Sequence, residues 1–392
     1  MKPNNRGLLW VDKYRPATLE EMDFHLELKE RLEGMAQRAD IPHLLFHGPP
    51  GSGKRTRVSC LLRLIYGPAA EKLKVEHRSF KVGDPPKEIE MTILSSVHHI
   101  EANPSDAGFS DRLIVQELIK EIASNAPLDV TAVKVPFKVI VLHEVDSLSR
   151  TGQQALRRTM EKYSRTCRLI LMADSLTKII EPLRSRCNLV RVPSPSEKEI
   201  CAVLQKVSKK EGFELPDQFA VKVTRACSKN LRRGLLQLQS SKMDNYPFAE
   251  DQVGATPPNI PSCTSFLSSS VGFFNPTQPV SRADWELVCI DIASLLMREQ
   301  SNKRLLLVRT RFYELLTHAI PADAIFERVT MELLRSADQE IAPAICECAA
   351  EYEHRLKQGQ KAIIHLEAFA ARFMQIYKEY IDNQYSMLID DD

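Results

Sequence analysis

Apolar residues in the first half of the chain form two kinds of pattern, short continuous runs and longer stretches with helical spacing. Helical spacing predicts helices at 111–124 and 152–163. Strands that alternate with helices are typical of a parallel sheet, so this part is predicted to be an α/β domain. The short continuous apolar runs predict the buried strands of this domain, at 43–47, 137–142, 168–173 and 188–192.

Residues 72–100 follow a different pattern. Two stretches, 74–77 and 89–93, flank the sequence Gly-Asp-Pro-Pro at 83–86. Glycine, aspartate and proline favour tight turns between strands. We therefore predict a β-hairpin in this segment.

The strand patterns end at residue 193, and helical patterns follow. Residues 243–281 contain six Pro, many Ser and neither Lys nor Arg, which predicts a flexible linker. Four or five amphipathic helices are predicted in 285–385. Three short helices are predicted before the linker, at 197–211, 216–226 and 231–242. The predicted division is an α/β domain (1–193), a small helical domain (194–242), the linker (243–281) and an all-α domain (282–392).

Composition narrows the class of protein without indicating a function. The formal net charge is only +2, so any basic surface must be local. The sequence contains no run of about 18 apolar residues, so we expect no membrane span. The N-terminus lacks the apolar stretch of a signal peptide. The nine cysteines have neither zinc-site nor disulfide-framework spacing, so we predict no metal site and a reducing compartment.

Residues 48–56, Gly-Pro-Pro-Gly-Ser-Gly-Lys-Arg-Thr, have the composition of a phosphate-binding loop. They lie between an apolar run and a helical pattern, which is the strand–loop–helix context that such a loop requires. Backbone N–H groups, the helix N-terminus and Lys54 would face the phosphates. However, Arg55 occupies the position at which a serine or threonine hydroxyl normally binds Mg²⁺.

A second departure follows the apolar run 139–142. In a Walker B motif this strand ends in two acids, of which the first binds Mg²⁺ and the second polarises the attacking water. Here the two positions are His143 and Glu144. An imidazole is a poor ligand for Mg²⁺, which prefers oxygen. Thr56 is one residue too late on the helix to replace the missing hydroxyl, because its side chain is rotated by about 100°.

Five motifs occur in a fixed order along the chain. They are 10–16 (Trp-Val-Asp-Lys-Tyr-Arg-Pro), the phosphate loop, 144–146 (Glu-Val-Asp), 155–161 (Ala-Leu-Arg-Arg-Thr-Met-Glu) and 185–187 (Ser-Arg-Cys). Together they resemble a small subunit of replication factor C, the eukaryotic sliding-clamp loader of the AAA+ ATPases, and in particular the type with degraded ATPase motifs. The resemblance implies an AAA+ nucleotide-binding domain, a small helical lid and a C-terminal helical collar that holds five subunits together.

The resemblance also assigns roles to single residues. Asp174 stands at the position of the sensor 1 asparagine and Arg232 at the sensor 2 arginine. Glu144 is a vestigial Walker B glutamate, and Arg186 is an arginine finger for a neighbouring subunit. The residues beside the adenine would be Val11, Tyr14, Arg15 and Pro16, and those around the phosphates Gly48, Gly51, Ser52, Gly53, Lys54, Arg55 and Thr56.

These departures lead to a hypothesis about the site. Arg55 and His143 remove both Mg²⁺ ligands, and Asp174 places an anion near anionic phosphates. The site is therefore expected to hold ATP or ADP without well-held Mg²⁺ and with little or no hydrolysis. Two alternatives remain at this point: an active AAA+ ATPase that hydrolyses ATP in its own site, and a pure scaffold whose nucleotide site is empty.

Basic residues on two predicted helices suit contact with DNA phosphates, although solvated helix faces are the alternative. Arg157 and Arg158 could instead couple neighbouring subunits. The family resemblance implies four other clamp-loader subunits, the sliding clamp PCNA and primer–template DNA as partners, no membrane, and a nuclear location. The candidate DNA-binding residues are Arg112, Lys120, Arg150, Arg157 and Arg158.

Overall fold

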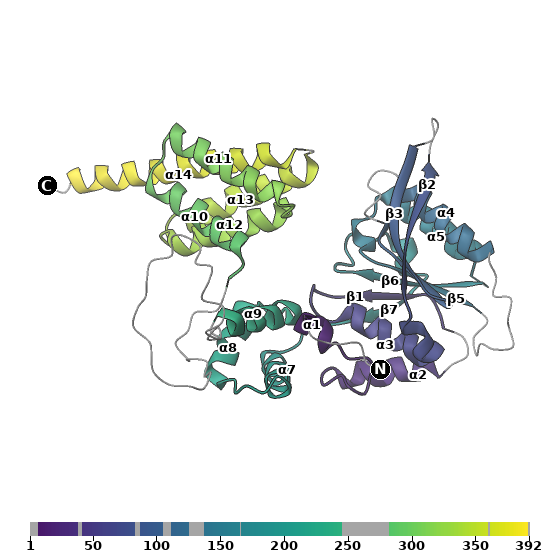
Figure 1. Cartoon of the computed structure of the whole chain (residues 1–392). Coiled ribbons are helices and arrows are strands. Elements are labelled where there is room, and N and C mark those ends of the chain that lie inside the picture. Colours follow the sequence, from purple (N-terminus) through teal and green to yellow (C-terminus); the bar gives the residue numbers. More distant parts are fainter. Residues whose placement is uncertain are drawn as a thin grey trace, which may run out of the picture. The chain divides into compact units, whose positions relative to one another are not determined.

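The computed structural model describes residues 7–37, 41–82, 87–104, 111–124, 137–164, 166–244, 282–359 and 361–390. The chain divides into two compact units, residues 1–281 and residues 282–392 (Figure 1). Of the predicted linker, 243–281, the structure describes only Met243 and Asp244, which are helical.

A seven-stranded sheet forms the centre of the first unit, in the order β2–β3–β4–β5–β6–β1–β7 within the described residues. The strands from β4 to β7 in this order pair in parallel, whereas β3 pairs antiparallel with both β2 and β4. The predicted α/β class with a parallel sheet is confirmed. The strands are β1 Leu44–His47, β2 Lys74–Val82, β3 Lys87–Ser95, β4 His99–Ala102, β5 Lys138–Leu142, β6 Cys167–Ala173 and β7 Asn188–Arg191.

The predicted hairpin is confirmed, and one strand was not predicted. β2 and β3 pair from Lys74 opposite Ser95 to Val82 opposite Lys87, and the predicted turn at 83–86 lies outside the described residues. β4 escaped prediction because it is only four residues long and two of them are ionisable. It nevertheless lies inside the sheet, between β3 and β5.

Helices cover both faces of the sheet, and strand residues alternate between the two cores. Leu44 and Phe46 pack in one core with residues of α2 and α3, whereas Leu45 packs in the other with residues of α4 and α5. This period of two is what a sheet buried on both faces produces. The helices and short 3₁₀ turns of this part are α1 Trp10–Lys13, α2 Leu26–Ala36, α3 Lys54–Tyr66, η1 Gly67–Glu71, α4 Asp111–Ser124, η3 Val145–Ser147, α5 Arg150–Lys162 and α6 Glu181–Arg184.

Three further helices form the lid of the first unit, as predicted: α7 Glu197–Lys210, α8 Asp217–Ala226 and α9 Leu231–Asp244. Ser196 and Glu199 form a capping box that fixes the start of α7. The lid has its own core, which also includes Trp10 of α1. The N-terminal helix is therefore packed against the lid.

The second unit is all-helical, in agreement with the prediction. Its core contains four buried phenylalanines contributed by three of its helices. Across the described residues, no helix is both long enough and apolar enough to span a membrane. The helices are α10 Asp284–Arg298, α11 Asn302–Thr317, α12 Ala322–Ser336, α13 Ala342–Gln358 and α14 Ala362–Asp390.

Candidate nucleotide site

The glycine-rich loop joins the end of β1 to the start of α3, as the sequence predicts. A Cβ atom at Gly48 would lie 1.9 Å from the backbone oxygen of Val192, so a side chain does not fit there. Gly51 has φ +73°, and a Cβ atom there would lie 1.9 Å from Oδ1 of Asn230, which directly precedes lid helix α9. These glycines let the loop approach both β7 and the lid closely.

A buried arginine supports the loop from beneath. Arg57 is only 2% exposed, and its Nη1 donates to the backbone oxygen of Ser52 over 3.0 Å. Nη2 lies 3.0 Å from Nδ1 of His25, and the guanidinium stacks on Phe24. Burial lowers the pKa of Arg57 to about 10, which leaves it charged at neutral pH. The sequence analysis did not single out this residue, because an arginine on a helix is usually exposed.

The residues predicted to border the adenine line one cavity between the loop and the lid. Tyr14 is fixed by its hydroxyl, which donates to Oε1 of Glu211 on the lid side over 2.5 Å. Burial and that hydrogen bond raise the pKa of Tyr14, so it stays neutral. The cavity is lined by Val11, Tyr14, Arg15, Pro16, Gly51, Gly53, Thr56 and Arg232, together with apolar lid residues such as Val203, Val207 and Leu235.

A second cavity adjoins the first at the phosphate loop and is more polar. It shares Arg15, Gly51, Gly53, Thr56 and Arg232 with the first. Gly48 and Ser52 are not among the lining residues of either cavity; Ser52 is 1% exposed. The lining residues that only the second cavity has include Lys54, Arg55, Glu101, His143, Glu144 and Asp174.

Lys54 and Asp174 meet directly in this second cavity. Nζ of Lys54 lies 2.5 Å from Oδ1 of Asp174 and also donates to the backbone oxygens of Gly48 and Pro49 over 2.6 and 3.0 Å. The loop after β6 that carries Asp174 is held by Asp146, whose Oδ2 accepts from the backbone N–H groups of Asp174 and Ser175 over 3.3 and 3.4 Å. The anion predicted at the sensor 1 position therefore lies against the loop lysine.

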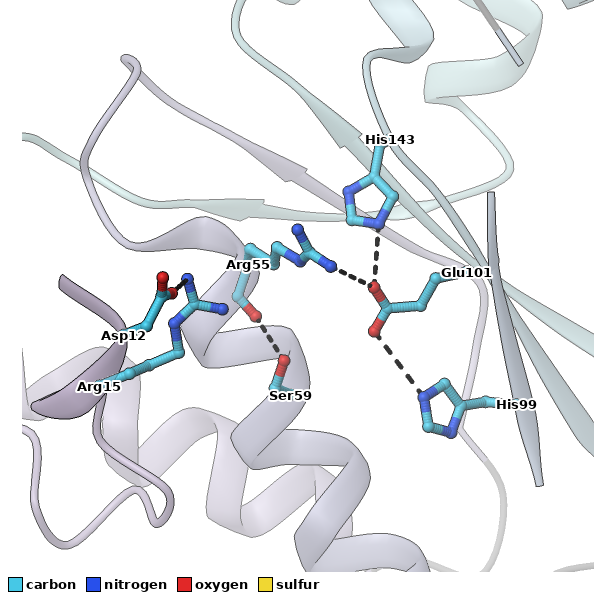
Figure 2. Close-up of polar contacts among 7 residues, drawn as sticks. All are labelled: Asp12, Arg15, Arg55, Ser59, His99, Glu101 and His143. Carbon is cyan, nitrogen blue, oxygen red and sulfur yellow. Dashed lines mark hydrogen bonds and ion pairs between the residues drawn. The ribbon is translucent and has the colours of Figure 1, made fainter. Parts of the chain in front are cut away.

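Arg55 and His143, the residues at the two metal-ligand positions, converge on one carboxylate that was not predicted. Nη2 of Arg55 and Nε2 of His143 each lie 3.2 Å from Oε2 of Glu101, and Figure 2 shows the two side chains meeting at this carboxylate. His99 approaches the other oxygen, with Nε2 at 3.8 Å from Oε1. Glu101 is 4% exposed. A buried carboxylate normally needs such cationic or donor partners, and here it has three.

These partners also fix the charge of Glu101. Burial alone would raise the pKa of this carboxyl, but hydrogen bonds with His143 and His99 and the charge of Arg55 outweigh burial and hold the pKa well below its usual range. Glu101 is thus ionised at neutral pH. The only sequence signal was a lone acid in a short stretch, His-Ile-Glu-Ala, which gave no indication of its distant partners.

Glu144 takes an unusual backbone conformation next to this network. It has φ 49° and ψ 44°, the left-handed region, and precedes the 3₁₀ turn η3. Such conformations are uncommon for residues other than glycine and often occur at functional sites. In the part of the chain that the structure describes, no group of three His, Cys, Asp or Glu side chains is arranged to hold a metal ion.

Arg186 lies elsewhere and lines neither cavity. It follows α6, and its guanidinium is bound by Glu161 of α5: Nε and Nη2 lie 2.8 and 2.5 Å from Oε1. Nη1 donates to the backbone oxygen of Pro182 over 2.9 Å. The predicted arginine finger is therefore held by its own chain, away from the chain's own phosphate loop.

The candidate DNA-binding residues lie on two neighbouring helices. Arg112 and Lys120 belong to α4, and Arg150, Arg157 and Arg158 to α5; all five are exposed. The starts of the two helices are joined by buried Asp111, whose Oδ2 accepts from the backbone N–H of Ser149 over 2.7 Å while Oδ1 accepts from its hydroxyl over 2.9 Å. Asp111 was not predicted, and it holds the two N-termini together.

A mixed sheet with a parallel centre, a glycine-rich loop between β1 and α3, and a helical lid against that loop place the chain in the AAA+ class of folds. Family models match three consecutive parts of the chain. They are described as "DNA polymerase III, delta subunit" for residues 25–196, "RCF1/5-like, AAA+ ATPase lid domain" for residues 202–243 and "Replication factor C subunit 3, C-terminal domain" for residues 285–381.

Curated proteins match over nearly the whole chain. Replication factor C subunit 3 of Arabidopsis thaliana and subunit 5 of Oryza sativa are each 46% identical over 376 residues, covering 95% of this chain and 99% of the relative. Subunit 3 of Homo sapiens is 43% identical over 375 residues, covering 96% and 98%. The chain belongs to the replication factor C family, and these relatives carry the names subunit 3 and subunit 5.

Proposed function

We propose that the chain is a subunit of a heteropentameric clamp loader whose own site holds ATP or ADP with little or no hydrolysis and whose Arg186 serves a neighbouring subunit. One observation carries the first half of the proposal. Arg55 and His143, at the two positions where a hydrolytic site has Mg²⁺ ligands, are bound to the same buried carboxylate, Glu101.

The loop retains what a nucleotide needs. Its glycines allow the tight backbone course, and Lys54 and Arg232 supply charge for phosphates. The first cavity is lined largely by apolar side chains, among them Pro16 and Leu235, which suits a flat heterocycle. These residues fit a bound nucleotide at both ends, the base and the phosphates.

The same residues do not fit Mg²⁺. A guanidinium and an imidazole replace the hydroxyl and carboxylate that would bind it, and Oε2 of Glu101 already has two partners. Asp174 adds a negative charge 2.5 Å from Lys54. Phosphoryl transfer depends on positioning and on neutralisation of charge. A site with these groups binds phosphates better than it cleaves them.

Arg186 supports a catalytic role in trans. It is part-exposed and held by Glu161 and Pro182, and it lies outside both cavities of its own chain. An arginine donated across an interface raises phosphoryl-transfer rates by about 10³–10⁵-fold. We extend the proposal to the family's partners: four other subunits, PCNA, and primer–template DNA contacted through α4 and α5, in the nucleus.

The test of the first half of the proposal uses the full-length chain by itself. The chain is purified, denatured and extracted for bound ATP or ADP, and its Mg²⁺-dependent hydrolysis is measured beside that of a Lys54→Ala control. We expect extracted nucleotide from the wild type, little from the control, and hydrolysis no faster than in the control. Hydrolysis above the control would favour the active ATPase, and nucleotide-free wild type would favour the pure scaffold.

A further inference from the structure

Arg186 is held by a more specific arrangement than a surface arginine needs. Glu161, in the last turn of α5, receives the Nε and Nη2 edge of the guanidinium on one oxygen, and Pro182 receives Nη1. The side chains of Arg186 and Glu161 are 34% and 47% exposed. The three contacts come from two different elements, α5 and α6.

We propose that Glu161 is a positioning residue for the arginine that acts in trans; this inference rests on the proposed function. A guanidinium has five N–H donors. The three contacts use one on Nε, one on Nη2 and one on Nη1, so one donor on each terminal nitrogen remains. Donors that remain on both terminal nitrogens can bond to the oxygens of a phosphate. Glu161 thus orders the arginine without using the end that would meet a phosphate.

A second arginine also contacts Glu161. Nε of Arg157 lies 3.5 Å from the same oxygen, Oε1. The hydrogen bond from Arg186, followed by smaller effects of the charges of Arg186 and Arg157, lowers the pKa of Glu161. The pairs are exposed, and exposed ion pairs add little to the stability of a fold. Removing Glu161 should therefore change the position of Arg186 without unfolding the chain.

The chain offers a matched control close by. Glu181 pairs with Arg184 on α6, and this exposed Glu–Arg pair lies just before Arg186 in the sequence. A Glu181→Gln variant removes a carboxylate of the same kind from the same segment but leaves the contacts of Arg186 intact. Any effect specific to Glu161 must exceed the effect of this control.

The experiment measures the DNA- and clamp-stimulated ATPase of the assembled complex for Glu161→Ala, Glu161→Gln, Glu181→Gln, Arg186→Ala and the Glu161→Ala/Arg186→Ala double variant. We expect the loss of kcat in Glu161→Ala to be at least about half of the loss in Arg186→Ala. KM should change less than about two-fold, because the arginine contributes mainly in the transition state. Glu161→Gln, which keeps an acceptor oxygen, should lose less. The double variant should match Arg186→Ala alone, since Glu161 acts through that arginine.

Several results would overturn the inference. One such result is a Glu161→Ala complex whose kcat equals that of the Glu181→Gln control, although the kcat of the Arg186→Ala complex is reduced. The proposed function would then stand without this positioning role. A rise in kcat for Glu161→Ala would show that the carboxylate restrains the arginine, and a double variant worse than Arg186→Ala would show that Glu161 acts elsewhere. An Arg186→Ala complex with normal ATPase would remove the role in trans itself, and this inference with it.

Discussion

The same motif, an arginine against a glutamate, occurs in two regions of the first unit with opposite surroundings. Glu101, the partner of Arg55, is 4% exposed and has two histidines as further neighbours. Glu161, the partner of Arg186, is 47% exposed. A buried carboxylate cannot lose its cation cheaply, whereas an exposed one exchanges partners at low cost. The two arginines are themselves exposed, so the difference lies in the glutamates: buried Glu101 favours a fixed pair with Arg55, whereas exposed Glu161 would let Arg186 turn to a phosphate.

The largest effect expected from this comparison concerns the exposed pair. Arg186→Ala should lower hydrolysis at the neighbouring site that it faces by about 10³-fold. The stimulated ATPase rate of the assembled complex should fall by the fraction that the neighbouring site contributes to it. The amount of nucleotide bound by this chain should stay unchanged. Arg184→Ala, which removes an arginine from the preceding turn, serves as the control. Equal activity of the two variants would contradict the role of Arg186.

The next effect concerns nucleotide binding in the chain's own site. Lys54→Ala removes a part-buried ammonium that lies beside the phosphate loop. Hydrogen bonds to charged groups are worth about 1.5–3 kcal/mol, so affinity for ADP should fall about 10- to 100-fold. Titration calorimetry on the full-length chain measures this directly. If the affinity of the variant equals that of the wild type, the phosphates do not lie at this loop.

Restoring the two metal ligands would sharpen the contrast. The double variant Arg55→Ser/His143→Asp puts a hydroxyl and a carboxylate at the positions that Mg²⁺ requires. Mg²⁺ should then tighten nucleotide binding about ten-fold, while the wild type responds by less than about two-fold. Hydrolysis should stay low, because Asp174 remains beside Lys54. If Mg²⁺ tightens nucleotide binding by the wild type as much as by the double variant, the two residues do not prevent Mg²⁺ binding and this account is wrong.

The smallest effect concerns stability. Glu101→Gln keeps the shape of the side chain but removes the charge that Arg55 and His143 share, and it should lower the free energy of unfolding by about 1 kcal/mol at neutral pH, since Arg55 is part-exposed. The folded-state pKa of Glu101 lies below its usual value, so its contribution is present above the unfolded pKa and is lost as the pH falls through the folded one. Denaturant unfolding should therefore show a constant difference between variant and wild type above pH of about 4.5 and a shrinking one below it. A difference that grows on acidification would contradict this account of the network.

Much of the fold was predictable, because long apolar runs and helical periods survive in the sequence. The strand–loop–helix around Lys54, the three lid helices and the helical second unit follow from local patterns. The network around Glu101 could not be predicted in the same way. Its partners Arg55 and His143 are separated from it by 46 and 42 positions, and the strand that carries it is short and polar. Charge pairs across a sheet depend on tertiary packing, which no local period records.

The N-terminal motif illustrates the same limit. The resemblance placed Val11, Tyr14, Arg15 and Pro16 beside an adenine, and the structure gathers them in one cavity with the phosphate loop. The resemblance did not indicate that Trp10 would be buried in the lid core or that Tyr14 would be held by Glu211. The residues from the N-terminal motif that line the first cavity are therefore held in place by contacts with the lid.

The central claim is that this site holds nucleotide without Mg²⁺, and one measurement tests it most directly. ADP is titrated into the nucleotide-stripped, full-length chain by calorimetry, once with Mg²⁺ and once with EDTA. Because Arg55 and His143 occupy the positions of the metal ligands, we predict dissociation constants within about two-fold of each other, a difference below about 0.5 kcal/mol. Binding that is lost or weakened ten-fold or more in EDTA, by about 1.4 kcal/mol, would contradict the claim.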